Sequence, residues 1–214
     1  PPRSTLFPYT TLFRSGFLSE NAAFARACEA AGVTFIGPDS GAIDRLGDKR
    51  HAKDVAEKAG VPVAPWIQCG GTADAATVAA ISKIGFPVII KPAAGGGGKG
   101  MHKVTAADQL AELLPKAARE AKASFGDDAL LVEKFLEGPK HIEVQILADK
   151  HGTVLHLFER ECSLQRRHQK LLEETPSPSL TPQQRQAICA DAVRIAKTAN
   201  YSNAGTCEFL FDVQ

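Results

Sequence analysis

The sequence of 214 residues has almost no net charge and no long hydrophobic run. The formal net charge is +1, so no overall electrostatic field favours a nucleic acid or a membrane surface, and an anion site has to be a local cluster of basic side chains. No apolar stretch reaches the roughly 18 residues that a membrane-spanning helix requires. A hydrophobic content of 44% is ordinary for a globular chain. We therefore expect a soluble protein without a nucleic-acid or membrane partner.

Cysteine is present, but it is not arranged for cross-linking or for metal binding. The five cysteines stand at positions 28, 69, 162, 189 and 207. This is an odd number without close pairs, which argues against a disulfide framework and against a zinc site. We expect reduced, mostly buried thiols in a cytoplasmic protein.

An initiating methionine and a targeting signal are also missing. The chain begins with Pro1, and residues 1–15 lack the long apolar core and the cleavage site of a secretory signal. Residues 5–15 look like the in-frame translation of a sequencing-library adaptor, so we interpret 1–15 as a non-native, unstructured leader. Residues 211–214 lie inside an expected strand, and we expect the chain to be a fragment of a longer gene product.

Helix and strand signals alternate from residue 16 onwards and predict a mixed fold, part α/β and part α+β. In residues 16–62 the pattern predicts a helix from Ser19 to Ala31, a short strand over 33–36 and a helix over 42–59. These elements are expected to be the end of an N-terminal Rossmann-like domain, followed by a linker.

Two further units are expected after the linker. Residues 63–135 predict a small α+β unit, with helices over 72–84 and 106–125 and strands over 86–91, 101–104 and 129–134. Residues 136–214 predict an antiparallel hairpin around the turn at 149–152, a helix after the N-cap pair Thr181-Pro182, and a strand over 207–213.

The glycine-rich stretch at 95–100 is the most informative motif. It follows an apolar strand that ends in Lys91, and Lys99 lies within it. Glycines let backbone N–H groups approach an anion closely, and lysines add point charges, so the stretch predicts a site for nucleotide phosphates. A dinucleotide fingerprint requires a helix directly after the loop, and a Walker loop requires Ser or Thr after Gly-Lys. Neither follows here, and we interpret the loop as a mobile lid between two strands.

Charged residues inside predicted strands are the next candidates. Lys91 and Glu208 stand in strands that are otherwise apolar, and a buried charge requires a partner of opposite charge. Phosphate is the natural partner for Lys91, and a divalent cation bound together with phosphates is the natural partner for Glu208. Lys49 stands among other charges and by itself indicates only a solvated face. His141 and Glu143 alternate along one strand, where a structural histidine is the commoner case.

Two stretches complete the set. Residues 133–136, Glu133, Lys134, Phe135 and Leu136, end a strand and offer backbone groups to a purine edge, although an ordinary strand end fits equally well. Residues 160–174 combine many hydrogen-bond donors with an apolar pair at 171–172, which predicts a folded anion site.

Taken together, these motifs resemble the biotin carboxylase component of the biotin-dependent acyl-CoA carboxylases, an ATP-grasp family. The resemblance runs from Gly16 to Asp212. It is carried by residues 16–21, 35–38, 47–49, 88–91, 95–101, 133–134, 141–143, 161–170 and 205–211. One departure is Lys99, which stands where the family commonly has arginine. In that family ATP and bicarbonate give carboxyphosphate, and the carboxyl group passes to a ureido nitrogen of biotin on a carrier protein.

The resemblance implies roles for individual residues and partners for the chain. Residues 63–135 would be the glycine-rich lid subdomain, and 136–214 the first part of the larger ATP-grasp subdomain. The cofactors and substrates would be ATP, Mg²⁺ or Mn²⁺, bicarbonate and biotin. The partners would be a biotin carboxyl carrier protein and a carboxyltransferase, with a homodimer at full length. The implied ATP ligands are Lys49, Lys91, Gly97, Gly98, Glu133, Lys134, Phe135, Leu136, His141, His168 and Glu208, with Glu208 also a metal ligand and Lys170 the bicarbonate-binding catalytic residue.

Other parts of the family site would lie beyond residue 214, namely a second metal carboxylate with its asparagine, the glutamate base and the arginines for bicarbonate and biotin. We therefore expect the chain alone to be inactive. Alternatives are the carboxylase domain of pyruvate carboxylase, another ATP-grasp ligase such as carbamoyl-phosphate synthetase, and a nucleotide-binding module without enzymatic activity.

Overall fold

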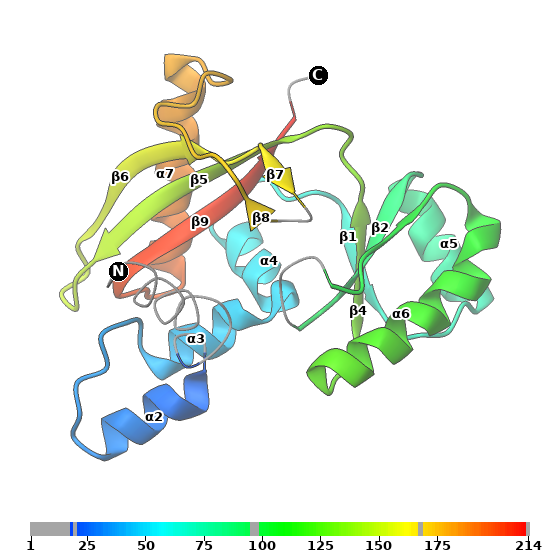
Figure 1. Ribbon diagram of the computed structural model, residues 1–214, viewed down its shortest axis with the longest axis horizontal. Coiled ribbons are helices and arrows are strands. Elements are labelled where there is room, and N and C mark those ends of the chain that lie inside the picture. Colours follow the sequence, from blue (N-terminus) through cyan, green and yellow to red (C-terminus); the bar gives the residue numbers. More distant parts are fainter. Residues whose placement is uncertain (1–17, 19–20, 95–98, 167–168, 213–214) are drawn as a thin grey trace, which may run out of the picture.

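The computed structural model describes residue 18 and residues 21–94, 99–166 and 169–212 (Figure 1). These residues form two lobes, each an antiparallel sheet with helices on one face. The mixed α/β class expected from the sequence is confirmed. Within the described residues, no helix combines the length and apolar character that crossing a membrane requires. All five cysteines are free, and Cys162 and Cys189 are buried.

The first lobe is a four-stranded sheet with the order β1-β4-β2-β3. Its strands are β1 (Trp66–Cys69), β2 (Val88–Pro92), β3 (His102–Val104) and β4 (Leu130–Lys134), and its helices are α5 (Ala75–Ile84), the short 3₁₀ helix η2 (Ala107–Gln109) and α6 (Leu110–Phe125). Ile81 of α5 and Leu114 of α6 pack with Val88, Ile90 and Val132 in one apolar cluster. Both helices therefore cover the same face of this sheet.

Strand alternation sends the charged side chains of the first lobe to the opposite face. Successive side chains in a strand point to opposite sides of the sheet. Because Ile90 and Val132 point toward the helices, Lys91 and Glu133 point away from them. Ile89 is the register partner of Glu133, so Lys91 is its diagonal neighbour on that face.

The second lobe is a three-stranded sheet with the order β6-β5-β9. Its strands are β5 (Lys140–Ala148), β6 (Val154–Glu161) and β9 (Asn203–Phe211), and helix α7 (Pro182–Thr198) covers one face. Ile142, Val144 and Ile146 of β5 pack against Ile188 and Ala192 of α7. The alternate residues of β5 and β9 face away from α7 and are available for a site.

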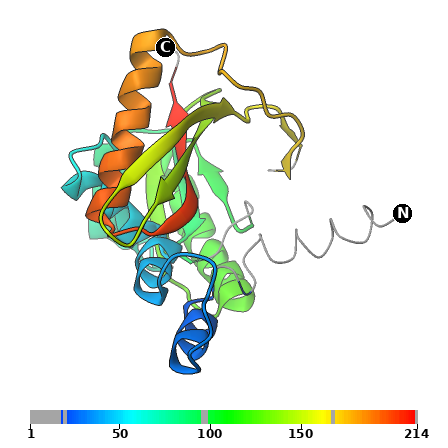
Figure 2. The ribbon, with the colours of Figure 1, turned by 90° about the vertical axis from the view of Figure 1, so that its left-hand side faces the viewer.

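A small hairpin of β7 (Gln165–Arg166) and β8 (Gln169–Lys170) lies on the side of this sheet opposite α7 (Figure 2). Its base is fixed by hydrogen bonds between the backbones of Glu161 and Glu174, with N–O distances of 2.9 and 3.1 Å. The N–H of Cys162 also donates to the carbonyl of His141 at 2.8 Å. These contacts fix the base of the hairpin beside β5.

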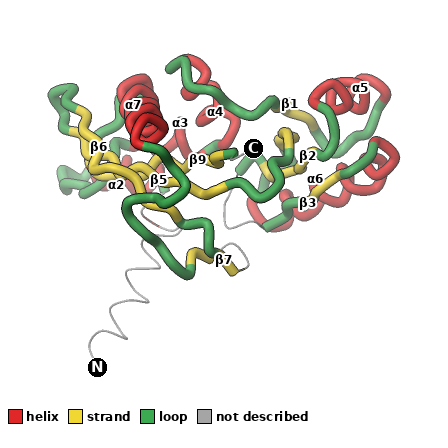
Figure 3. The backbone as a smooth tube through the Cα atoms, turned by 90° about the horizontal axis from the view of Figure 1, so that it is seen from above, coloured by secondary structure: helices red, strands yellow, loops and turns green. Residues whose placement is uncertain are grey.

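Three helices precede the first lobe: α2 (Ala22–Ala30), α3 (Ser40–Gly47) and α4 (Lys49–Lys58). Helix α4 lies between the two lobes in Figure 1 and also in the view from above in Figure 3. The Lys49 N–H donates to the carbonyl of Ala93 in the first lobe at 3.2 Å. Arg194 of α7 donates to the carbonyl of Ala59 at the end of α4 at 3.3 Å. Helix α4 thus connects the lobes.

Several sequence expectations were wrong in detail. The expected strand at 33–36 is not a strand, and its Ile36 side chain is 88% exposed. The helix expected over 42–59 is two helices, because Asp48 is extended and its carboxylate accepts the N–H of Arg50. Strand β1 was not expected. Helix α2 is capped by Asn21. The proposed leader, 1–15, and the Ser19 cap lie outside the described residues.

Candidate functional site

Two glutamates lie side by side on the face of the second sheet that α7 leaves uncovered. Glu143 of β5 and Glu208 of β9 are register partners in the antiparallel pair. Like charges that stand directly opposite each other on neighbouring strands are destabilising unless cations are near. The side chain of Glu143 is 1% exposed, so its charge in particular requires partners.

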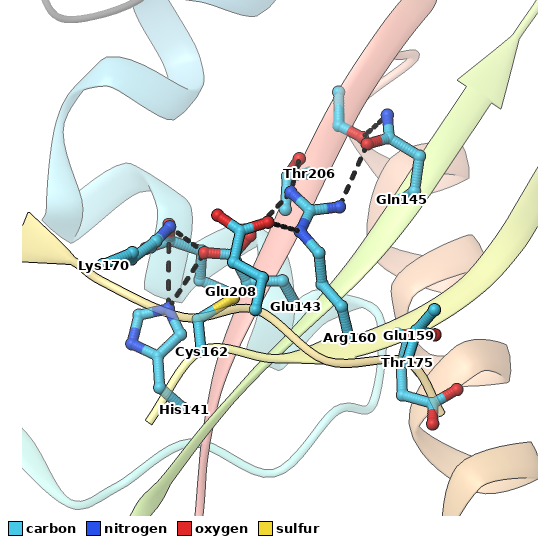
Figure 4. Close-up of polar contacts among 12 residues, drawn as sticks. His141, Glu143, Gln145, Glu159, Arg160, Cys162, Lys170, Thr175, Thr206 and Glu208 are labelled. Carbon is cyan, nitrogen blue, oxygen red and sulfur yellow. Dashed lines mark hydrogen bonds and ion pairs between the residues drawn. The ribbon is translucent and has the colours of Figure 1, made fainter. Parts of the chain in front are cut away.

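Arg160 and Lys170 supply these positive charges (Figure 4). Arg160 of β6 is the register partner of Glu143 on its other side, and its Nη2 lies 2.6 Å from Glu143 Oε2. The ammonium of Lys170 on β8 is bound to Glu143 Oε1 and lies 2.7 Å from Glu208 Oε1. Lys170 therefore joins the two carboxylates, and the hairpin brings it there.

His141 completes the cluster. Its Nε2 lies 3.2 Å from Glu143 Oε1 and 3.8 Å from Glu208 Oε1. The nearby His141 ring and the contacts with Lys170 outweigh burial and hold the pKa of Glu208 at about 2. Glu208 is consequently ionised at neutral pH.

This donor set fits a divalent cation. One ligand atom each from His141, Glu143 and Glu208 lie within 4.8 Å of one another. Mg²⁺ binds carboxylate oxygens together with substrate phosphates. Glu143 is already held by Lys170 and Arg160, whereas the side chain of Glu208 is 55% exposed, so Glu208 is the carboxylate better placed to receive a cation.

A second cluster surrounds Glu133 on the helix-free face of the first sheet. The ammonium of Lys91 is bound to Glu133 Oε1, and Lys53 of α4 lies 2.8 Å from Glu133 Oε2. Burial raises the pKa of Glu133, but the charges of Lys91 and Lys53 outweigh it, and the pKa lies below its ordinary value. Lys91, next to the last residue of β2, thus has the ion pair that a buried lysine requires.

Lys49 is the first residue of α4 and belongs to the same region. Burial lowers the pKa of the Lys49 ammonium, and the positive charge of Lys91 lowers it further. Lys49 is half-buried, and its backbone N–H is bonded to Ala93, directly after β2, so Lys49 does not lie on a solvated face.

The stretch 133–136 does not present all of its groups to one side. The ammonium of Lys134 binds the carbonyls of Gly85 and Phe86 at 2.9 and 3.1 Å. The N–H groups of Lys134 and Phe135 donate to the carbonyls of Pro65 and Pro87. The Phe135 ring lies 4.2 Å from the ammonium of Lys103. A ligand at this strand end would use the remaining backbone groups, including those of Leu136.

The structure thus brings the predicted residues into two clusters, His141, Lys170 and Glu208 in one and Lys49, Lys91 and Glu133 in the other. Gly97, Gly98 and His168, together with most of the expected lid, lie outside the described residues.

Lys53 had no role expected from the sequence, Arg160 was expected only as part of the anion site at 160–174, and the role of Glu143 was left open. Glu143 carried a usable signal, since it is a carboxylate between the apolar residues Ile142 and Val144 of a strand. Lys53 carried none, because helix charges usually face solvent.

Comparison with known proteins identifies the family of the chain. Residues 48–214 match the family "Carbamoyl-phosphate synthase L chain, ATP binding domain", and residues 15–43 match "Biotin carboxylase, N-terminal domain". Pyruvate carboxylase from Bacillus subtilis is 53% identical over 91% of this chain and 17% of its own length. The methylcrotonoyl-CoA carboxylase alpha subunit from Glycine max is 50% identical over 92% of this chain and 27% of its own length. The chain thus spans less than a third of these relatives.

Solved structures give the same result. A biotin carboxylase from Campylobacter jejuni, in complex with a β,γ-ATP ligand, superposes with a TM-score of 0.87 at 44% identity, over 92% of this chain and 44% of its own. The biotin carboxylase domain of 2-oxoglutarate carboxylase from Hydrogenobacter thermophilus, in complex with MgADP, ADP and bicarbonate, superposes with a TM-score of 0.85 at 47% identity, over the same 92% and 44%. This chain belongs to the family of biotin carboxylase ATP-grasp domains.

Proposed function

We propose that the chain is the nucleotide-binding part of a biotin carboxylase. The reaction is attack of a bicarbonate oxygen on the γ-phosphorus of ATP, which gives carboxyphosphate and ADP. The carboxyl group is then transferred to a ureido nitrogen of biotin, which loses its proton, and inorganic phosphate is released. The observation that carries the proposal is the convergence of Lys170, Glu143 and Glu208 from three separate strands. Charged side chains that converge from separate strands are typical of a binding site.

Lys91 and Lys49 are proposed to hold the phosphates. Lys91 lies near the end of β2, and the backbone N–H of Lys49 donates to the carbonyl of Ala93, which lies between β2 and the glycine-rich loop. The backbone of Gly97 and Gly98 is proposed to close over the phosphates from the other side. Phosphoryl transfer depends mainly on positioning and charge neutralisation, which is what such groups supply.

The stretch 133–136 is proposed to read the adenine base. Because the N–H groups of Lys134 and Phe135 are already donated, base recognition falls to the carbonyls of the stretch and to the N–H of Leu136. His141 and His168 are proposed to line the nucleotide pocket.

Lys170 is proposed to bind bicarbonate, and Glu208 to bind Mg²⁺ or Mn²⁺. Bound metal would neutralise charge on the transferred phosphoryl group. The Lys170 ammonium donates to Glu143 and Glu208, and its third N–H is left for an anion. Glu143 also has Arg160 as a partner, so its buried charge stays compensated if Lys170 moves toward the anion.

Biotin is proposed to arrive on a carboxyl carrier protein or domain, and a carboxyltransferase is proposed as the further partner. The final acceptor is proposed to be an acyl-CoA, with pyruvate as the alternative that many relatives favour by name. A homodimer is proposed for the longer protein.

Nucleotide binding is the direct test. We expect the chain to bind ATP in the presence of Mg²⁺, and Lys91→Met to weaken binding at least about tenfold, the size of one charge-assisted contact. Lys83→Met, at an exposed lysine on α5, should leave binding unchanged. Absence of ATP binding in titration calorimetry would contradict the proposal.

The carboxylation step can be tested in a chimera. Residues 21–212 would replace the matching segment of a complete biotin carboxylase, and phosphate release that depends on both bicarbonate and biotin would be measured. We expect activity in the chimera and its loss in Lys170→Ala. A folded chimera that binds ATP without biotin-dependent cleavage would favour a nucleotide-binding module.

A further inference from the structure

Lys53 of α4 is a charged side chain to which neither the motifs nor the comparisons assign a role. Its ammonium lies 2.8 Å from Glu133 Oε2, and its side chain is 18% exposed. The side chain of Glu133 is 8% exposed, so this is a largely desolvated ion pair between a helix of the N-terminal segment and a strand of the first lobe.

The carboxylate of Glu133 is shared by two lysines. Lys53 holds Oε2, and Lys91 holds Oε1. A carboxylate shared in this way cannot neutralise either ammonium fully, since it carries one negative charge against two positive ones. The region keeps a surplus positive charge next to the start of the glycine-rich loop, and in a poorly solvated place such a surplus attracts an anion strongly.

Removal of Lys53 would change the ion pairs of Glu133. Glu133 would then be left with Lys91 as its ion-pair partner, and both oxygens would be available to it. The ammonium of Lys91 would be drawn toward the strand and away from a ligand. Lys53 therefore controls how much of the Lys91 charge remains for a phosphate.

We propose that Lys53 is a positioning residue of the nucleotide site, which acts through Glu133 to keep Lys91 available to the polyphosphate of ATP. The inference rests on the proposed function, because it takes Lys91 as a phosphate ligand. It predicts an effect that depends on the number of phosphates. Base recognition is assigned to backbone groups of 133–136, whereas the Lys53 ammonium lies against the side chain of Glu133.

The test compares ATP with AMP at constant ionic strength, by displacement of a fluorescent nucleotide. We expect Lys53→Met to weaken ATP binding about tenfold and AMP binding less than about twofold. Lys53→Arg should largely restore ATP binding, since it keeps the charge. Lys58→Met, at an exposed lysine of the same helix, is the matched control and should change neither affinity.

The route through Glu133 is tested by a double-mutant cycle. In a Glu133→Gln background the effect of Lys53→Met on ATP should shrink to less than about threefold, because the shared carboxylate is gone. An undiminished effect would mean that Lys53 touches phosphate directly and would overturn the positioning role. If Glu133→Gln does not fold, the cycle is run with Glu133→Met, which also removes the shared charge.

The remaining outcomes distinguish failure of the proposed function from failure of the role proposed for Lys53. A wild-type chain that binds no ATP refutes the proposed function and the inference with it. A wild-type chain that binds ATP, while Lys53→Met binds ATP normally or loses ATP and AMP equally, refutes the inference alone. In the second case Lys53 only joins α4 to the first lobe.

Discussion

Each of two buried carboxylates has two positively charged side chains as partners. Glu143 is held by Lys170 and Arg160, and Glu133 by Lys53 and Lys91. Removal of one partner from a buried pair leaves an uncompensated charge, which costs more than the pair itself contributes. A carboxylate with two cations tolerates the loss of one of them to a ligand. That property suits residues whose partners are proposed to bind phosphate or bicarbonate.

Glu161 is buried in a different way, with hydroxyl groups as its main partners. Its Oε1 accepts from Ser163 at 2.7 Å and its Oε2 from Ser177 at 2.7 Å. Burial raises the pKa of Glu161, but these hydroxyls and the charge of Lys140 outweigh burial and hold it at about 2. Because Glu161 also forms the base of the β7–β8 hairpin, this carboxylate fixes the segment that carries Lys170.

Replacement of Glu161 by Gln should lower the free energy of unfolding at pH 7 by about 2 kcal/mol, since a buried charge-assisted network loses its acceptor. A depressed pKa stabilises the folded state above the ordinary pKa of 4.5, and this contribution is lost as the pH falls from there toward about 2. The difference between wild type and variant should therefore shrink from pH 7 to pH 3 in urea unfolding. Glu137→Gln, at an exposed glutamate, should show no such difference. A difference that is independent of pH would show that shape, and not charge, makes Glu161 important.

At the scale of elements, caps were the signals that predicted boundaries best. Thr181 caps α7 in a capping box with Gln184, and Pro182 takes the first helical position. The hairpin turn at 149–152 is confirmed, with Asp149 Oδ1 accepting two backbone N–H groups. Such signals are local, so the sequence alone is sufficient to predict them.

The cap of α7 provides a prediction. Thr181→Ala should lower the free energy of unfolding by about 1 kcal/mol, because a backbone N–H at the start of the helix loses its acceptor. Thr198→Ala, the same chemical change at the exposed last residue of α7, should cost much less. Thermal or urea unfolding measures both values. Equal costs for the two variants would show that the capping box contributes no stability.

The sequence could not predict the strands that depend on pairing with a neighbouring strand. The segment 33–36 has strand-forming residues, but a strand requires a neighbour to pair with, and in the described part of the chain it has none. Strand β1 has little alternation and exists through its pairing with β4. The break between α3 and α4 was readable, since Gly47 and Asp48 favour a helix end and a cap.

In the candidate site too, some residues were predictable from the sequence and others were not. Lys91 and Glu208 were predictable because a charge in an apolar strand is unusual wherever the strand lies. The contacts of Lys53 and Arg160 depend on the tertiary structure. Lys53 contacts Glu133, which is far away in the sequence, and Arg160 reaches Glu143 through the register of β5 and β6. Sequence reasoning predicts which charges are unusual, and only the fold shows what they touch.

At the scale of the whole molecule, the two lobes have separate apolar cores. Ile90 belongs to the cluster of the first sheet and Ile146 to that of the second, and no described residue belongs to both clusters. The described links through α4 include the hydrogen bonds of Ala93 and Ala59 and the ion pair of Lys53. Polar links of this kind couple domains more weakly than a shared core does.

We therefore expect two unfolding transitions in calorimetry without ligand. Ile90→Ala should lower the stability of one transition and Ile146→Ala that of the other, each by about 2 to 5 kcal/mol, because each substitution leaves a cavity in one core. Saturating MgATP should raise both transitions and bring them together, since the proposed site uses Lys91 from one lobe and Glu208 from the other, and a ligand stabilises every part that must be folded to bind it. A single transition that both variants lower equally would mean that α4 makes the lobes one cooperative unit, and ATP would then be expected to shift that transition without changing its width.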